Sequence, residues 1–125
     1  VATSSMVQVA LEAANELESD DISAEVVDPR TLVPLDKATI VKSVQKTGRA
    51  LVIDEGHLKY GTTAELSAVI QEEAFDYLDA PVARIGATDV PVPFSTSLEF
   101  ETIPNEEKVV NAVKGMWGPE GKRIG

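Results

Sequence analysis

The stretch VIDEGHLKYGTTAEL, residues 52–66, decides how the rest of the chain is interpreted. It begins with apolar residues typical of a buried strand, passes through a loop, and continues into a pattern typical of a helix. Gly56 and Gly61 stand at the two glycine positions of the phosphate-binding loop G-x-x-x-x-G-K-[ST]. The segment therefore either binds a nucleotide phosphate or only joins a buried strand to its helix.

Three features of this loop argue against a phosphate site. Thr62 occupies the position where such loops need a lysine that reaches the phosphates, and Lys59 lies too early in the loop to replace it. Asp54 and Glu55 place two carboxylates at the end of the strand, where they would repel a phosphate. We therefore expect Gly56 and Gly61 to allow a tight turn between strand and helix.

The start of the helix still offers free N–H groups that could hold an anion. A free-standing anion- or nucleotide-binding domain that uses residues 56–63 thus remains an alternative. His57, the only histidine, lies in the same loop and could do acid–base chemistry with a carboxylate. A lone loop histidine is more often structural or solvent-exposed, and the sequence predicts neither a catalytic set nor a metal site.

Strand-like and helix-like segments alternate on both sides of this stretch. Apolar runs predict strands at residues 22–28, 50–54 and 81–86. Four helices are predicted from apolar residues at helical spacing, and their buried positions would be Met6, Ala10, Ala13 and Leu17; Ile40, Val41 and Val44; Leu66, Val69, Ile70 and Ala74; and Val109, Val110, Val113 and Met116. This alternation predicts one domain over residues 1–125, a three-layer α/β/α sandwich with a mostly parallel sheet.

Polar residues at the predicted helix ends are candidates for caps. We expect caps from Ser4 or Ser5, from Asp36 with Gly48 at the other end of its helix, from a capping box of Thr62 and Glu65, and from Asn105. The stretch 87–104, before the last helix, is predicted to be irregular.

Composition excludes several classes of function. The chain has no cysteine, which excludes disulfides, thiol nucleophiles and zinc–thiolate sites. A net charge of −10 argues against a nucleic-acid or anionic-membrane partner and would suit a basic protein partner. No targeting segment or apolar run of about 18 residues is visible, so a cytoplasmic location is expected if the source is prokaryotic. The opening VATSS without a methionine favours a fragment of a longer protein.

Three longer stretches resemble one family. They are AEVVDPRTLVPLD (24–36), VKSVQKTGRALVIDEGH (41–57) and EEAFDYLDAPVARIGATDVPVPF (72–94). They are similar to the C-terminal domain of the β subunit of thiamine-diphosphate-dependent 2-oxoacid dehydrogenases, the E1 component of pyruvate, branched-chain and acetoin dehydrogenase complexes. Many members have tryptophan where this chain has His57, which leaves the substrate open. Another transketolase-superfamily enzyme is the alternative.

The resemblance implies a role in assembly rather than in chemistry. In this family thiamine diphosphate and Mg²⁺ lie outside the segment, so neither catalytic nor cofactor-binding residues are expected within it. The implied partners are an E1 α subunit, a second β subunit, and the subunit-binding domain of the lipoyl acyltransferase, a small basic module. Asp76 and Asp79, in an acidic run with Glu72 and Glu73, are the expected contacts for that basic module. Glu72, Asp76 and Asp79 would share one helical face as long as the helix continues.

The motif residues Asp28, Arg30, Pro34 and Asp36 mark the transketolase superfamily and have a structural interpretation. Pro34 is expected to keep the loop extended before Asp36 caps the next helix. Arg30 is expected to pair with Asp28, Asp36 or Asp54 and so tie loops together at one end of the sheet. A second segment, with Asp89, Pro91 and Pro93, is expected to be rigid and to suit an interface or a turn.

Overall fold

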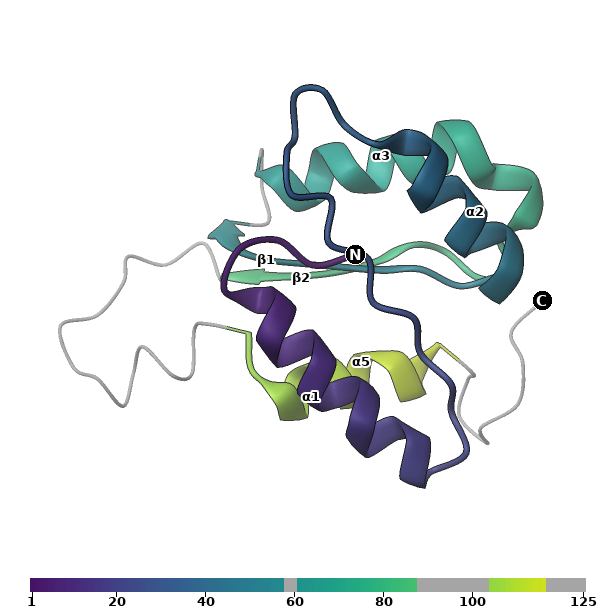
Figure 1. Cartoon of the computed structure of the whole chain (residues 1–125). Helices are drawn as coiled ribbons and strands as arrows, with labels where there is room; N and C mark the ends of the chain where they lie inside the picture. The colour runs from purple at the N-terminus through teal and green to yellow at the C-terminus, as the bar shows by residue number, and fades with distance from the viewer. Residues whose placement is uncertain (58–60, 88–103, 117–125) are drawn as a thin grey trace, which may run out of the picture.

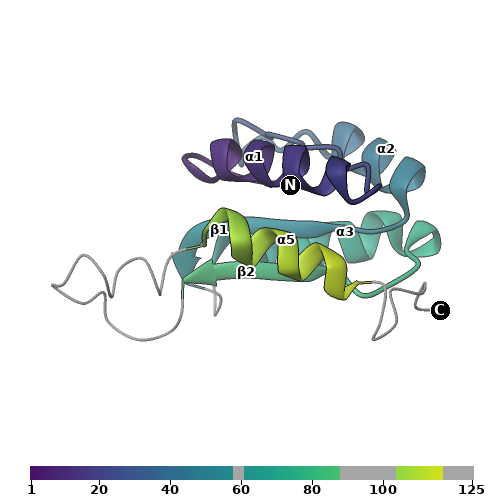
Figure 2. The same cartoon turned by 90° about the horizontal axis from the view of Figure 1, so that it is seen from below.

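The computed structural model describes residues 1–57, 61–87 and 104–116. Its elements are α1 (Met6–Ser19), α2 (Lys37–Thr47), β1 (Leu51–His57), α3 (Thr62–Ala74), the 3-10 helix η1 (Phe75–Tyr77), β2 (Ala83–Ala87) and α5 (Glu106–Gly115). The helices α2 and α3 lie on one side of the strands, and α1 and α5 lie on the other (Figures 1 and 2). The predicted three-layer α/β/α arrangement with parallel strands is confirmed.

The described strands form a parallel pair. Leu51 lies opposite Ala83 and Ile53 lies opposite Ile85, and α3 makes the crossover that parallel strands require. The first residues of the chain lie along the other edge of β1. There Ile53 N donates to Val1 O at 2.8 Å, and Thr3 N donates to Ile53 O at 3.2 Å. Residues 1–3 therefore form a short parallel extension of the sheet.

The prediction of a strand at residues 22–28 is wrong, because this segment forms no ladder with a neighbouring strand. Its nearest backbone partner is the short segment 1–3, and a single bond, from Ala2 N to Val27 O at 3.0 Å, joins the two. A strand is defined by repeated bonds to a neighbour, and three residues are too few to supply them. Val27 is nevertheless buried, as a strand residue would be.

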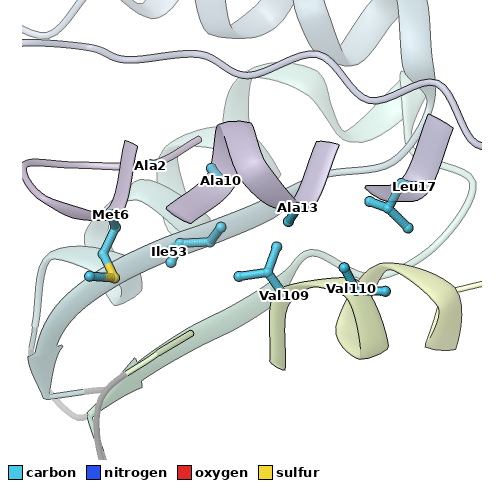
Figure 3. Packing of buried hydrophobic residues seen from close by; sticks show 8 residues of the cluster. All are labelled: Ala2, Met6, Ala10, Ala13, Leu17, Ile53, Val109 and Val110. Carbon is cyan, nitrogen blue, oxygen red and sulfur yellow. The ribbon is translucent and has the colours of Figure 1, made fainter. Parts of the chain in front are cut away.

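Two apolar clusters fill the space on either side of β1. The first joins α1, β1 and α5 and consists of Ala2, Met6, Ala10, Ala13, Leu17, Ile53, Val109 and Val110 (Figure 3). The second joins α2, α3 and β1 and consists of Val27, Ile40, Val44, Ala50, Val52, Leu66, Ile70 and Ala74. Val52 and Ile53 belong to different clusters because successive strand residues point to opposite faces. All four predicted helical stripes are confirmed, with Val41 and Val113 only partly buried.

The predicted caps of α2 and α5 are confirmed. Asp36 Oδ1 accepts from Thr39 N at 3.2 Å, and Asn105 Oδ1 accepts from Lys108 N at 2.9 Å. Gly48 ends α2 with φ of +76°. This left-handed conformation favours glycine.

The predicted caps of α1 and α3 are wrong. Ser5 precedes α1, but its backbone is already helical and its side chain makes no capping bond. An N-cap side chain reaches the free N–H groups from a non-helical backbone, so Ser5 is badly placed to do so. Thr62 is the first residue inside α3 and Gly61 holds the cap position, so no capping box forms with Glu65. None of the helices in the described ranges has the length and apolar character to span a membrane.

Candidate functional site

The carboxyl end of β1 is built around the side chain of Asp54. Its Oδ1 accepts a short hydrogen bond from Thr3 Oγ1, and its Oδ2 accepts from Gly56 N at 3.0 Å. A Cβ atom on Gly56 would lie 2.8 Å from Asp54 Oδ2. A side chain at residue 56 would therefore press on the carboxylate of Asp54, which ties residues 1–3 to β1.

Gly61 does not have the role expected from the sequence. Its φ of −96° and ψ of −178° describe extended backbone, which any residue can adopt. The prediction that this glycine relieves a tight turn is therefore wrong. Lys59 and the side chain of His57 lie outside the described residues, so their roles in residues 56–63 stay predictions.

A metal ion held by protein side chains alone would need a convergent set of ligands. Among the residues that the structure describes, no group of three or more histidine, aspartate or glutamate side chains is arranged to hold one.

The loop at residues 28–36 is shaped by its own polar groups. Arg30 has a positive φ of 62°, and its backbone N–H donates to Asp28 Oδ1 at 3.0 Å. Within the described chain, no ion pair joins the exposed Arg30 side chain to Asp28, Asp36 or Asp54, so that prediction is wrong. Asp28 and Asp36 accept instead from backbone N–H groups of their own turns.

The same loop is also more compact than predicted. Leu32 and Leu35 form an isolated antiparallel bridge, and Thr31 Oγ1 donates to Pro34 O at 2.8 Å. Pro34 therefore lies in a tight reversal of the chain and does not keep the loop extended. The exposed tip presents Val33, whose side chain is 92% accessible.

The acidic run at the end of α3 is divided by the end of that helix. The helix ends at Ala74, and Asp76 lies in η1, so the continued helix that would place Glu72, Asp76 and Asp79 on one face is absent. Asp79 lies against the end of α2, where its N–H donates to Gly48 O at 2.7 Å and its carboxylate lies 3.8 Å from Arg49 Nη1. The side chain of Asp76, by contrast, is exposed to solvent.

Two aromatic residues beside Asp76 were missed in the sequence analysis. Phe75 is 64% accessible and Tyr77 is 48% accessible, although large apolar side chains are usually buried. The sequence carried a signal for Phe75, which falls off the buried stripe of α3, whereas Tyr77 would lie on that stripe if the helix continued past Ala74. Aromatic residues are enriched at protein interfaces, so η1 joins an acidic side chain to two exposed rings in one candidate contact surface.

Two glutamate side chains meet where α1 packs against α5. Glu16 shares a hydrogen bond with the carboxyl group of Glu106 and, with burial and the charge of Glu12, raises the pKa of Glu106 above its usual value. Lys114 Nζ lies 3.0 Å from Asp20 Oδ2 and joins the C-terminal ends of the same two helices.

Residues 1–109 match the family described as "Transketolase, C-terminal domain". The chain belongs to this family. This transketolase C-terminal domain is 51% identical over 114 residues to the "Pyruvate dehydrogenase E1 component subunit beta" of Rickettsia bellii, with 91% of the chain covered. It is 47% identical over 114 residues to the mitochondrial "Pyruvate dehydrogenase E1 component subunit beta-1" of Arabidopsis thaliana.

A solved structure supports the same assignment. The transketolase C-terminal domain superposes on a "Split gene transketolase, inactive beta4 tetramer" with a TM-score of 0.75 and 33% identity, covering 90% of this chain and 35% of that one. The domain also spans only about a third of its curated relatives, 35% of the Rickettsia protein and 31% of the Arabidopsis protein.

Proposed function

We propose that the chain is the C-terminal domain of a 2-oxoacid dehydrogenase E1 β subunit, with pyruvate as the substrate of the complete enzyme. The single observation that carries the proposal is the 51% identity over 114 residues to a pyruvate dehydrogenase E1 β subunit. The complete enzyme would decarboxylate pyruvate oxidatively and transfer the acetyl group to a lipoyl group. The domain itself would serve assembly, through contacts with an E1 α subunit and a second β subunit.

The cofactor of such an enzyme would be thiamine diphosphate with Mg²⁺, which supplies a stabilised carbanion when bound. Magnesium bound to a diphosphate needs only one or two protein carboxylates, because phosphate oxygens and waters complete its ligand set. The carboxylate of Asp54 is occupied by Thr3 and Gly56. We propose that the cofactor binds on other parts of the complete enzyme, as the resemblance to the E1 β family implies.

The 33% identity to a split-gene transketolase supports a second candidate, a transketolase that acts on sugar phosphates. An activity assay separates the two. The complete gene product would be co-expressed with the α subunit encoded in the same genome and assayed with pyruvate, a branched-chain 2-oxoacid, acetoin and a ketose phosphate. We expect the fastest turnover with pyruvate. Turnover of the ketose phosphate alone would overturn the proposal in favour of the transketolase.

We further propose that η1 and the turn after it form a docking surface for a basic partner, such as the subunit-binding domain of the lipoyl acyltransferase. Asp76 and Asp79 would supply negative charge, and Phe75, next to Asp76 in the chain, would supply an apolar anchor. Both Asp76 and Phe75 are exposed, and 42% of the side chain of Asp79 remains accessible beside Arg49. Charge complementarity of this kind raises association rates and makes binding sensitive to salt.

Surface plasmon resonance of the assembled E1 against the acyltransferase subunit-binding domain tests this surface. At low salt we expect Asp76→Asn and Asp79→Asn each to weaken binding by roughly two- to fivefold, the range of single exposed ion pairs. Phe75→Ala should weaken binding at every salt concentration, because its contribution is apolar. The matched control is Glu12→Gln on α1, on the opposite face of the sheet. Unchanged affinity in the double aspartate variant at low salt would contradict the proposal.

A further inference from the structure

A slot of about 400 Å³ lies between residues 22–27 and the first residues of β1. One wall is formed by Ala24 and Val26, and the facing wall by Ala50 and Leu51. The remaining two sides come from helices on opposite faces of the sheet, α1 through Ala13 and α2 through Val44. The slot therefore has the surroundings of a strand position in the middle layer of the sandwich. Extended chain borders it on both edges, and one helix covers each face.

The backbone on both walls is arranged as in a parallel sheet. Residues 1–3 bond to β1 on one side, and Ala2 N donates to Val27 O on the other. In a strand the N–H and C=O of one residue point to the same side. Leu51 O and Val27 O both accept bonds from residues 1–3, so the N–H groups of Leu51 and Val27 also point toward the strip between the walls.

The amino group of Val1 lies at the mouth of this slot. It donates to Leu51 O at 2.7 Å, the bond that a peptide N–H makes in a parallel ladder. Burial lowers the pKa of this amino group to about 6, because a charged ammonium is poorly solvated there. A peptide N–H would make the same bond without a charge to bury.

We propose that the slot holds a further strand, parallel to β1, formed by residues that immediately precede Val1 in a longer polypeptide. Chain continued backwards from Val1 in the same register would pass between Leu51 and Val27 and meet their N–H groups with its own carbonyl oxygens. The middle layer would then run in the order residues 22–28, the added strand, β1 and β2. Residues 22–28 would gain the neighbour whose absence leaves them without a ladder.

The shape of the slot also indicates the chemistry of its occupant. One face meets the small side chains of Ala10 and Ala13, which leave room for large residues, and the other meets Ile40 and Val44. A strand buried on both faces is continuously apolar. We therefore expect about four or five residues rich in valine, isoleucine or leucine, the length set by a rise of about 3.3 Å per residue along the walls. This inference does not rest on the proposed function.

Amide hydrogen exchange in the complete gene product tests the proposal. The native protein would be compared with a variant in which the six residues before Val1 are replaced by a glycine–serine linker of equal length. We expect the amides of Leu51 and Val27 to exchange at least about tenfold faster in the linker variant, because a glycine–serine segment lacks the apolar side chains that would hold a strand, and its carbonyl oxygens, in the slot. The amide of Val26 points away from the slot and serves as the internal control.

Each other outcome has a definite meaning. Equal exchange at Leu51 and Val27 in the two proteins would overturn the proposal, as would a reading frame that supplies no residues before Val1. If these amides are protected in both proteins but lose protection when the chain is cut after Met116, the slot is filled by the C-terminal residues instead. If they are protected only when purified acyltransferase or α subunit is added, the occupant comes from that partner.

Discussion

At the scale of single residues, the backbone requires glycine at residue 48 but not at residue 61. Gly48 has a φ of +76°, and a Cβ there would collide with the carboxylate of Asp79, whereas Gly61 has an extended backbone. We expect Gly48→Ala to lower the free energy of unfolding by about 1–2 kcal/mol, the cost of a left-handed conformation for a residue with a side chain. Gly61→Ser is the control, because serine adopts an extended backbone and is a good N-cap, and it should not lower the free energy of unfolding by more than about 0.5 kcal/mol. Urea unfolding measures both, and an equal loss would contradict the assignment.

The carboxylate of Asp36 should make stability depend on acid pH. Hydrogen bonds from the side chain and backbone of Thr39 lower the pKa of Asp36 below its usual value in the folded state. A lowered pKa contributes stability that is present above the unfolded value, near 3.8, and is lost as pH falls through the folded value. Asp36→Asn keeps an N-cap but removes the titration, so its melting temperature should fall less steeply below pH 4 than that of the unchanged protein. If the melting temperatures of the two proteins fall equally steeply below pH 4, the carboxylate of Asp36 does not have this role.

Sequence patterns identified residue roles only where the role is local. The caps Asp36 and Asn105 were predicted correctly because a short side chain bonds an N–H three residues away. Arg30 was predicted wrongly because its partners depend on where other loops lie, and its side chain remains exposed. Thr62 and Glu65 have the spacing of a capping box, but α3 begins one residue too early for it.

At the scale of elements, the contact between α1 and α5 should weaken as pH rises. The pKa of Glu106 is raised by its hydrogen bond to Glu16, by burial and by the charges of Glu16 and Glu12. A raised pKa favours the folded state when the group is protonated, so this contribution is fully present below the unfolded value, near 4.5, and is lost as pH rises through the folded value.

Glu106→Gln should therefore raise the melting temperature at pH 7 and reduce the change in melting temperature between pH 4 and pH 7. Differential scanning calorimetry at both pH values measures this, with the exposed neighbour Glu107→Gln as the control. If the two variants behave alike, the contact with Glu16 does not act on stability.

The helices were easier to predict than the sheet. Each helical stripe appears in the sequence at a spacing of three or four residues, and burial of Met6, Ala10, Ala13 and Leu17 follows from that spacing alone. A strand needs a neighbour that is distant in sequence. The apolar residues at 22–28 therefore had a strand pattern but lack the paired ladder, and only the structure shows the slot beside them.

At the scale of the whole molecule, negative charge is in excess. The chain has 21 acidic residues against 11 lysines and arginines, a net charge of −10. Self-repulsion of this kind destabilises the compact state, and salt screens it. The ion pairs in the described part of the chain mostly join exposed side chains, such as Lys46 with Glu25 at 3.5 Å, and lose little when they are screened.

Screening of repulsion should therefore outweigh screening of attraction. We expect the melting temperature to rise by roughly 2–5 °C between 0.05 and 0.5 M sodium chloride, corresponding to about 1 kcal/mol for a domain of this size. The control is sucrose at equal osmolality, which acts by exclusion from the surface and does not screen charge. A melting temperature that falls with sodium chloride would mean that ion pairs such as Arg49 with Asp79 contribute more than the excess charge costs. In that case the carboxylates of this surface, such as that of Asp79, would already be paired with cationic side chains of the same chain. They would then be less available to a basic partner.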